Sequence, residues 1–410
     1  MQKDLHMSNM QYSIALTVTL VPYVIAEIPS NLLLKAIGPN LMLPAMSTLW
    51  GIVTIMQGLV HNYHNLVACR FFLGLLKANR VALFFSAASL SGAFSGLLAF
   101  AIIKMDGIGG RPGWAWIFFL KGLVTVLVGL ISFIALPRSV EDSKFLNETE
   151  KELVLQQLSN DSIVSRDTQA DNLNWKAAVK ALALPQVWFI AGIFLFAGII
   201  TSALSLHLIP VINYCSSFTP SILLGLGYSP SRAQLMSVPP FAAAFVVTLL
   251  VSLLSDKYSH RGYSAMFSAA LCIIGFAMYF KSRSFHVQYG SLFLSISGIS
   301  SSGPALAMWL AKNAAPHSHQ ATAIAIGFIS TNIGSIIATW LYSAWSHPPR
   351  YTSGTITLLV GSIMMAVLAF ANILYLKQQN RKKAVIRQQM TREEEAEGLG
   401  DHSAWFIYCT

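Results

Sequence analysis

Charged side chains are scarce in this sequence. Asp, Glu, Lys and Arg together make up 11% of the 410 residues, whereas an ordinary soluble domain carries roughly 25%. Hydrophobic residues reach 54%, and they gather in runs of the ~20 residues that a helix needs to cross a bilayer. This shortage of charge argues against a soluble domain and indicates an integral membrane protein with many spans.

Cysteine is also rare, and no cysteine motif is present. The four cysteines, Cys69, Cys215, Cys272 and Cys409, show no paired spacing, and three of them lie in or beside apolar stretches. This pattern excludes a disulfide framework, a zinc site and a redox motif. A cleavable signal peptide is not expected either, because the first apolar run has full span length and lacks a cleavage-site pattern. We therefore expect no cofactor and no metal ion.

Acidic residues are outnumbered by basic ones, 17 to 27, which gives a net charge of +10. Such a surplus can indicate nucleic-acid binding. Here, however, the basic residues lie in short runs between apolar segments, which is the positive-inside pattern of membrane proteins. When the basic run after Leu376 is placed in the cytoplasm, the other dense basic loops fall on the same side. We therefore expect a cytoplasmic tail and no nucleic-acid partner.

The apolar runs give about ten full spans. They cover residues 12–35, 41–60, 81–103, 114–136, part of 186–227, 239–255, 263–280, 287–310, 320–345 and 355–376. A further apolar piece, residues 66–76, would reach only about 16 Å, which is half the thickness of the hydrocarbon layer. Placing the dense basic loops in the cytoplasm puts Met1 outside, so the chain must cross the membrane an odd number of times before the tail. About ten full spans do not meet this condition unless the short piece also crosses.

One long polar segment divides the chain. We predict an N-terminal helical half over residues 1–136, a cytoplasmic central loop over 137–185, a C-terminal six-helix half over 186–376 and a cytoplasmic tail over 377–410. In the central loop, Asn147 with Glu150 three residues later predicts the start of a surface helix. Near the start of the second half, His207 is predicted to be a polar interface residue rather than a ligand.

The first apolar run contains a carboxylate, Glu27, together with Asn31 and two prolines. A charged group in hydrocarbon is costly, so it is tolerated where it faces a watery cavity, a partner charge or a proton path. Glu27 is therefore a candidate functional residue. The alternative is that Glu27, about two turns before Lys35, reaches the headgroups or caps a neighbouring helix.

A short charged turn joins two spans of the second half. Asp256, Lys257 and Arg261 surround it, and Gly262 follows. An acid and two bases at a tight turn can pair with neighbouring helix ends and latch one conformation of a two-state carrier. The alternative is an ordinary solvated loop.

This turn resembles the signature loop of the major facilitator superfamily, and the sequence as a whole resembles the fungal allantoate permease-like group of anion:cation symporters. Residues 35–39 look like a degraded first-half copy of the same loop. The other motifs that carry the resemblance are Pro22-Tyr23, Glu27 to Lys35, Arg70-x-x-x-Gly74, and residues 84–90, 226–230, 233–240, 305–313, 321–324 and 399–410. Together they cover nearly the whole chain.

The resemblance implies an all-α membrane protein with the two-half helical bundle of this superfamily. It also implies that the bundle is incomplete in the first half, with about 10–11 spans of twelve. The first span is absent, most of the fourth is missing between Leu76 and Arg80, and residues 207–217 are extra. We interpret this as a defective gene model or a splice form, and expect transport to be lost or severely impaired.

By the same resemblance, the function is proton-coupled uptake of a small organic anion, such as a vitamin, a ureide or an amino-acid derivative. The protein would act as a monomer in the plasma membrane, by alternating access. The residue roles that follow are proton coupling or charge balance for Glu27, contact with the anion for Arg70, lining of the cavity for Asn31, Trp309 and Asn332, and a conformational latch for Asp256, Lys257 and Arg261. For the three cavity residues we favour the alternative of helix packing.

Two other kinds of function were weighed. A membrane enzyme is disfavoured because no nucleophile–base spacing and no cluster of His, Asp and Glu lies within the spans. The nearest to a metal pair is His317 with His319, which lies on a loop without acidic partners. A non-transporting sensor derived from a carrier, or an inactive truncated product, is the remaining alternative to a transporter.

Overall fold

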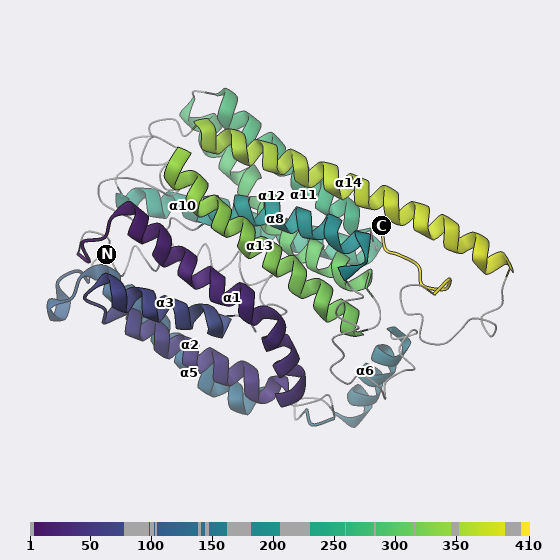
Figure 1. Ribbon diagram of the computed structural model, residues 1–410, viewed down its shortest axis with the longest axis horizontal. Coiled ribbons are helices and arrows are strands. Elements are labelled where there is room, and N and C mark those ends of the chain that lie inside the picture. Colours follow the sequence, from purple (N-terminus) through teal and green to yellow (C-terminus); the bar gives the residue numbers. More distant parts are fainter. Residues whose placement is uncertain are drawn as a thin grey trace.

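Long helices laid side by side make up the computed structural model of this protein (Figure 1). The structure describes residues 4–77, 98, 102, 105–137, 141–143, 147–161, 182–205, 230–258, 260–282, 284–314, 317–345, 352–389 and 403–410. The first half holds α1 (Asn9–Ile37), α2 (Pro39–Gly58), α3 (Tyr63–Lys77), the short 3-10 helix η1 (Ile108–Gly110) and α5 (Gly113–Ala135). The second half holds α8 (Pro185–Ser205), α10 (Pro230–Tyr258), α11 (Arg261–Lys281), α12 (Phe285–Lys312), α13 (His317–Trp345) and α14 (Thr352–Gln389).

Seven of the described helices are long and apolar enough to cross a membrane. They are α2, α5, α8, α10, α11, α13 and α14. Helices α1 and α12, with 29 and 28 residues, match two more predicted spans in position and exceed the length that a bilayer requires. The predicted span over residues 81–103 and the predicted irregular segment with His207 lie outside the described residues, apart from Leu98 and Ile102.

Short connections make successive helices antiparallel, as expected. At the turn between α1 and α2, Gly38 has a φ of +92°, a conformation that favours glycine, and Pro39 begins α2. Figure 1 shows this turn at the same end of the bundle as the surface helix α6 (Glu148–Asp161) and the end of α14. We call this the latch end, because the turn between α10 and α11 also lies there.

The predicted short piece at residues 66–76 is a helix, α3, whose described part is 15 residues long. At 1.5 Å per residue it reaches about 22 Å, longer than the sequence predicted but still short of the ~30 Å hydrocarbon layer. It packs along α1, and its approach is close at Gly74. A Cβ atom on Gly74 would collide with the carbonyl oxygen of Thr19.

The close approach of α1 and α3 at Gly74 leads to a prediction about stability. Gly74→Ala should lower the melting temperature of the purified protein by several degrees, because the added methyl group forces α1 and α3 apart, and overpacking of this kind costs about 1–3 kcal/mol. Gly290→Ala on α12 is the matched control, because a Cβ there meets nothing within 4 Å. Equal melting temperatures of the two variants, measured by fluorescence-detected size exclusion after heating, would contradict the predicted contact.

Two features outside the spans bear on the sequence predictions. The predicted cap of the surface helix is present, because the backbone N–H of Asn147 donates to the Glu150 carboxylate over 2.9 Å. The predicted tail from Lys377 begins as a continuation of the last helix. Helix α14 continues through the basic run to Gln389, since Lys, Arg and Gln are good helix formers.

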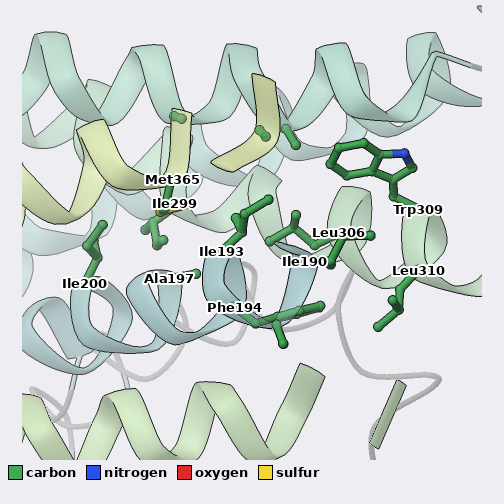
Figure 2. Close-up of a cluster of buried hydrophobic side chains, with 14 of the residues drawn as sticks. Ile190, Ile193, Phe194, Ala197, Ile200, Ile299, Leu306, Trp309, Leu310 and Met365 are labelled. Carbon is green, nitrogen blue, oxygen red and sulfur yellow. The ribbon is translucent and has the colours of Figure 1, made fainter. Parts of the chain in front are cut away.

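The larger core lies in the second half. Figure 2 shows Ile190 and Ile193 of α8 beside Leu306 of α12, and Trp309 and Leu310 belong to the same buried cluster. By contrast, α5 exposes Leu127, Ile131 and Ile134. Large exposed apolar side chains on a span-length helix are the surface that faces lipid.

Candidate functional site

The contact between α1 and α13 joins the two halves of the bundle (Figure 1). Glu27 lies there, and its side chain is only 2% exposed. Tyr23, one turn earlier on α1, shares side-chain hydrogen bonds with Glu27 and with Asn332 of α13. A buried carboxyl group is thus linked through one phenol to the other half of the protein.

A second polar link fixes the register of the same two helices. The indole N–H of Trp340 on α13 donates to the Thr17 hydroxyl on α1 over 3.2 Å. Thr17 pairs with Trp340, and the later residue Tyr23 of α1 pairs with the earlier residue Asn332 of α13. The two helices are therefore antiparallel. Asn332 also donates to the carbonyl of Phe328 over 2.7 Å. Its amide therefore bonds both its own helix and α1.

Arg70 lies at a different level of the bundle. It is 6% exposed, on α3, and it interacts electrostatically with the buried Tyr12 of α1. Tyr12 and Tyr23 are eleven residues apart on one helix, which is about 16 Å along its axis. The structure therefore does not bring Arg70 and Glu27 together. Arg70 lies beside the part of α1 near Tyr12, whereas Glu27 belongs to a later part of the same helix.

The predicted cavity residues fall in three different surroundings. Asn332 lies at the contact just described. Asn31 belongs to α1, but its side chain lies outside the part that the structure describes. Trp309 is completely buried in the core of the second half, and its indole N–H donates to the backbone carbonyl of Cys409 over 2.9 Å. This is the position of a packing residue, so we leave Trp309 out of the proposed pathway.

The charged turn between α10 and α11 contains one ion pair. A guanidinium nitrogen of Arg261 donates to the Asp256 carboxylate over 2.6 Å, with the Arg261 side chain 5% and the Asp256 side chain 62% exposed. Each charge lies at the end of its helix that the macrodipole disfavours, an acid in the last turn of α10 and a base at the start of α11. Helix stability alone therefore does not explain their placement.

Including Lys257 in this latch is not supported by the geometry. Its ammonium group lies 5.8 Å from the centre of the Tyr258 ring, and the side chain is exposed. The residue directly after Asp256 on a helix points about 100° away from it, so Lys257 does not face the Asp256–Arg261 pair.

Breaking the ion pair should destabilise the protein. Asp256→Ala leaves a buried guanidinium without its acceptor, which costs about 1–3 kcal/mol, and we expect a melting temperature several degrees lower. Glu148→Ala is the control, because it breaks a pair on the surface helix α6 in which Glu148 is 87% and Lys151 16% exposed, with 2.8 Å between the charged atoms. Exposed pairs are worth about 0–1 kcal/mol. If Asp256→Ala lowers the melting temperature no more than the control does, the Asp256–Arg261 pair contributes no more than an ordinary surface pair.

Sequence reasoning assigned no role to Tyr12, Thr17, Tyr23 or Trp340. The spacing of Tyr23 and Glu27, four residues apart on one helix, was a usable signal, because such residues lie on one face. The pairing of Thr17 with Trp340 carried no such signal. Among the described residues, no group of three or more His, Cys, Asp and Glu side chains could hold a metal ion.

Comparison with known proteins gives a consistent result. The sequence profile described as Major Facilitator Superfamily matches residues 77–339. An uncharacterized transporter of Schizosaccharomyces pombe is 30% identical over 404 residues, which cover 93% of this chain and 77% of that protein. The high-affinity nicotinic acid transporter of Saccharomyces cerevisiae is 26% identical over 412 residues, 94% of this chain and 73% of that protein.

Solved structures share the arrangement of helices. The inward-facing, unoccupied crystal structure of a bacterial homolog of the human lysosomal transporter Spinster has a TM-score of 0.61 at 15% identity, covering 90% of each chain. The D-xylose–proton symporter has a TM-score of 0.60 at 12% identity, covering 89% of this chain and 87% of that one. At these identities the likeness concerns the fold.

Proposed function

This chain belongs to the Major Facilitator Superfamily, and from that membership we propose that it carries a small organic anion together with a proton across the membrane. The expected all-α membrane fold of this superfamily is confirmed, and the protein is a multi-pass membrane transporter rather than an enzyme. The substrate class, the proton coupling and the plasma-membrane location are our proposal.

The observation that carries the proposal is the buried Glu27 carboxyl group at the contact between the halves. Gain or loss of a proton there changes the group to which Tyr23 is hydrogen-bonded, and Tyr23 also bonds Asn332 on the opposite half. A proton that interacts differently with two conformations shifts the balance between them. Glu27 is therefore suited to couple protonation to the relative movement of the halves.

In this proposal, residues 1–136 and 186–376 rock against each other, and the central loop and the tail lie in the cytoplasm. Arg70 binds the carboxylate of the substrate, since a guanidinium pairs with a carboxylate through two parallel hydrogen bonds. Nicotinate is the first substrate to test, because a relative is named for nicotinic acid and this compound is a small carboxylate anion at neutral pH.

The test is uptake of radiolabelled nicotinate by cells that express the chain, beside a restored version to which the first and fourth spans expected from the resemblance are added from the Schizosaccharomyces pombe relative. We expect the restored version to show saturable uptake that rises at acidic external pH, is abolished by a protonophore, and is competed by other small organic anions. We expect the restored version to be much faster. Equal uptake by both versions would overturn the predicted impairment.

Two other results would overturn the proposed function. Uptake of nicotinate by the restored version that is not reduced by a protonophore would exclude proton coupling. A rise in melting temperature with nicotinate, without uptake by either version, would favour a sensor derived from a carrier.

A further inference from the structure

Residues 403–410 lie against the latch end of the second half, and α12 and α14 hold their backbone. The Asn313 side chain accepts the backbone N–H of Cys409 over 2.7 Å and donates to its carbonyl over 2.9 Å. Asn380 binds the preceding residue in the same way, accepting from the Tyr408 N–H over 2.9 Å and donating to its carbonyl over 2.8 Å. Two side chains thus satisfy both backbone groups of two successive residues.

Further contacts hold the same segment. The Cys409 carbonyl also accepts the Trp309 indole N–H. On α14, the Lys383 ammonium donates to the Phe406 carbonyl over 3.1 Å and lies 4.1 Å from the centre of the Tyr408 ring. The Tyr408 side chain is itself buried. Backbone recognition is therefore combined with a cation–π contact and a buried aromatic anchor.

The segment contacts the ends of two helices, α12 and α14, whose side chains share one buried core. Helices α12 and α14 both pack on α8 and α11. The backbone groups of successive residues in an extended peptide point to opposite sides, which explains why Asn313, the residue directly after α12, and Asn380 of α14 bind successive residues. The segment therefore links the ends of the two helices.

One side chain, that of Trp309, lies between the docked segment and the turn that carries the latch ion pair. A Cβ atom on Gly262 would come within 2.8 Å of both the Trp309 ring and Ile373 of α14. The residue before Gly262 is Arg261, which binds Asp256. The Trp309 side chain therefore touches the latch turn and, through its N–H, the docked segment.

We propose that the ends of α12 and α14 form a docking site for an extended peptide, that the chain's own residues 403–410 occupy it, and that this occupation holds Trp309 against the Asp256–Arg261 turn. Asn313 and Asn380 bind the peptide backbone, and Lys383 contacts its aromatic side chains. The docking does not depend on what the protein transports.

The first test uses the full chain. Cys409 is partly accessible, and its alkylation by a maleimide can be followed by mass spectrometry of the peptide that contains it. Asn380→Ala should raise the alkylation rate about tenfold, because two hydrogen bonds that keep the segment docked are lost. Arg381→Ala, the exposed neighbour on α14, should leave the rate unchanged. Equal rates in both variants would refute the docking.

The second test supplies the peptide separately. A fluorescent synthetic peptide of residues 403–410 should bind a chain that lacks these residues but should not bind the full chain, where the site is occupied. Asn313→Ala in the shortened chain should weaken binding about tenfold. Binding that is the same with and without Asn313 would refute the proposed recognition. Should the shortened chain fail to fold, the alkylation test on the full chain still decides.

The link to the latch is tested by combining variants. If the segment holds the latch turn, then releasing it costs less once the ion pair is broken, so Asp256→Ala and Asn380→Ala together should lower the melting temperature by less than the sum of their separate shifts. Asp256→Ala combined with Arg381→Ala should be additive. Additivity in both combinations would show that docking and latch are independent.

Discussion

Glu27→Gln should abolish the pH dependence of uptake. The substitution keeps the size and hydrogen-bonding capacity of the buried side chain, but it removes the group that gains and loses a proton. If protonation of Glu27 shifts the contact of Tyr23 with Asn332, the variant loses the coupling between proton and conformation. Coupling energies of this kind correspond to about 5–150-fold in affinity, and we expect a loss of that size in uptake at acidic external pH.

The measurement is initial uptake of nicotinate by the restored version at acidic and neutral external pH, normalised to protein at the cell surface. Thr54→Val is the matched control. Thr54 is a buried polar residue of α2 whose hydroxyl donates to its own helix, at Trp50, over 2.7 Å, away from the contact between the halves. A variant at Glu27 that keeps the pH response of the parent would exclude Glu27 as the coupling group.

Arg70→Lys should weaken binding of the anion without removing the pH response. Lysine keeps the charge but cannot form two parallel hydrogen bonds to a carboxylate. We expect KM for nicotinate to rise about tenfold, since hydrogen bonds to charged groups are worth about 1.5–3 kcal/mol. Arg111→Lys is the control, because Arg111 lies outside the helices and its side chain hydrogen-bonds with His61 over 3.4 Å.

A KM unchanged by Arg70→Lys would remove Arg70 from the binding site. The distance between the two sites adds a stricter condition. Arg70 lies beside Tyr12 and Glu27 beside Tyr23, about 16 Å apart along α1. Effects of residues this far apart usually add, so the double variant should combine the higher KM of one with the lost pH response of the other.

The helical architecture was largely predictable, because hydrophobic length is a local property. Residues 41–60 and 114–136 were predicted to span, and α2 and α5 cover the same stretches within two residues. The short piece before Lys77 was also visible, since a run of apolar residues too short for the bilayer can be counted. In α14 the apolar run predicted the span but not the end of the helix, because good helix formers carry the helix past the apolar run to Gln389.

The candidate site was predictable only where the signal was electrostatic or local. A lone carboxylate in an apolar run marked Glu27, and an acid with a base five residues later marked the Asp256–Arg261 pair. Lys257 was included because the turn is rich in charge, but the direction of its side chain excludes it. Trp309 was a cavity candidate through the resemblance, with helix packing as the favoured alternative, and in the structure it is buried in the core and binds the Cys409 carbonyl.

The sequence by itself determined that this protein lies in a membrane, which segments are helical and which few ionisable residues are buried, because each of these follows from the cost of placing backbone and charge in hydrocarbon. Only the tertiary structure decided which helices meet. It linked Tyr23 to Asn332, separated Arg70 from Glu27, and seated residues 403–410 between α12 and α14. Such pairings depend on contacts between residues far apart in the chain, and no local pattern of the sequence encodes them.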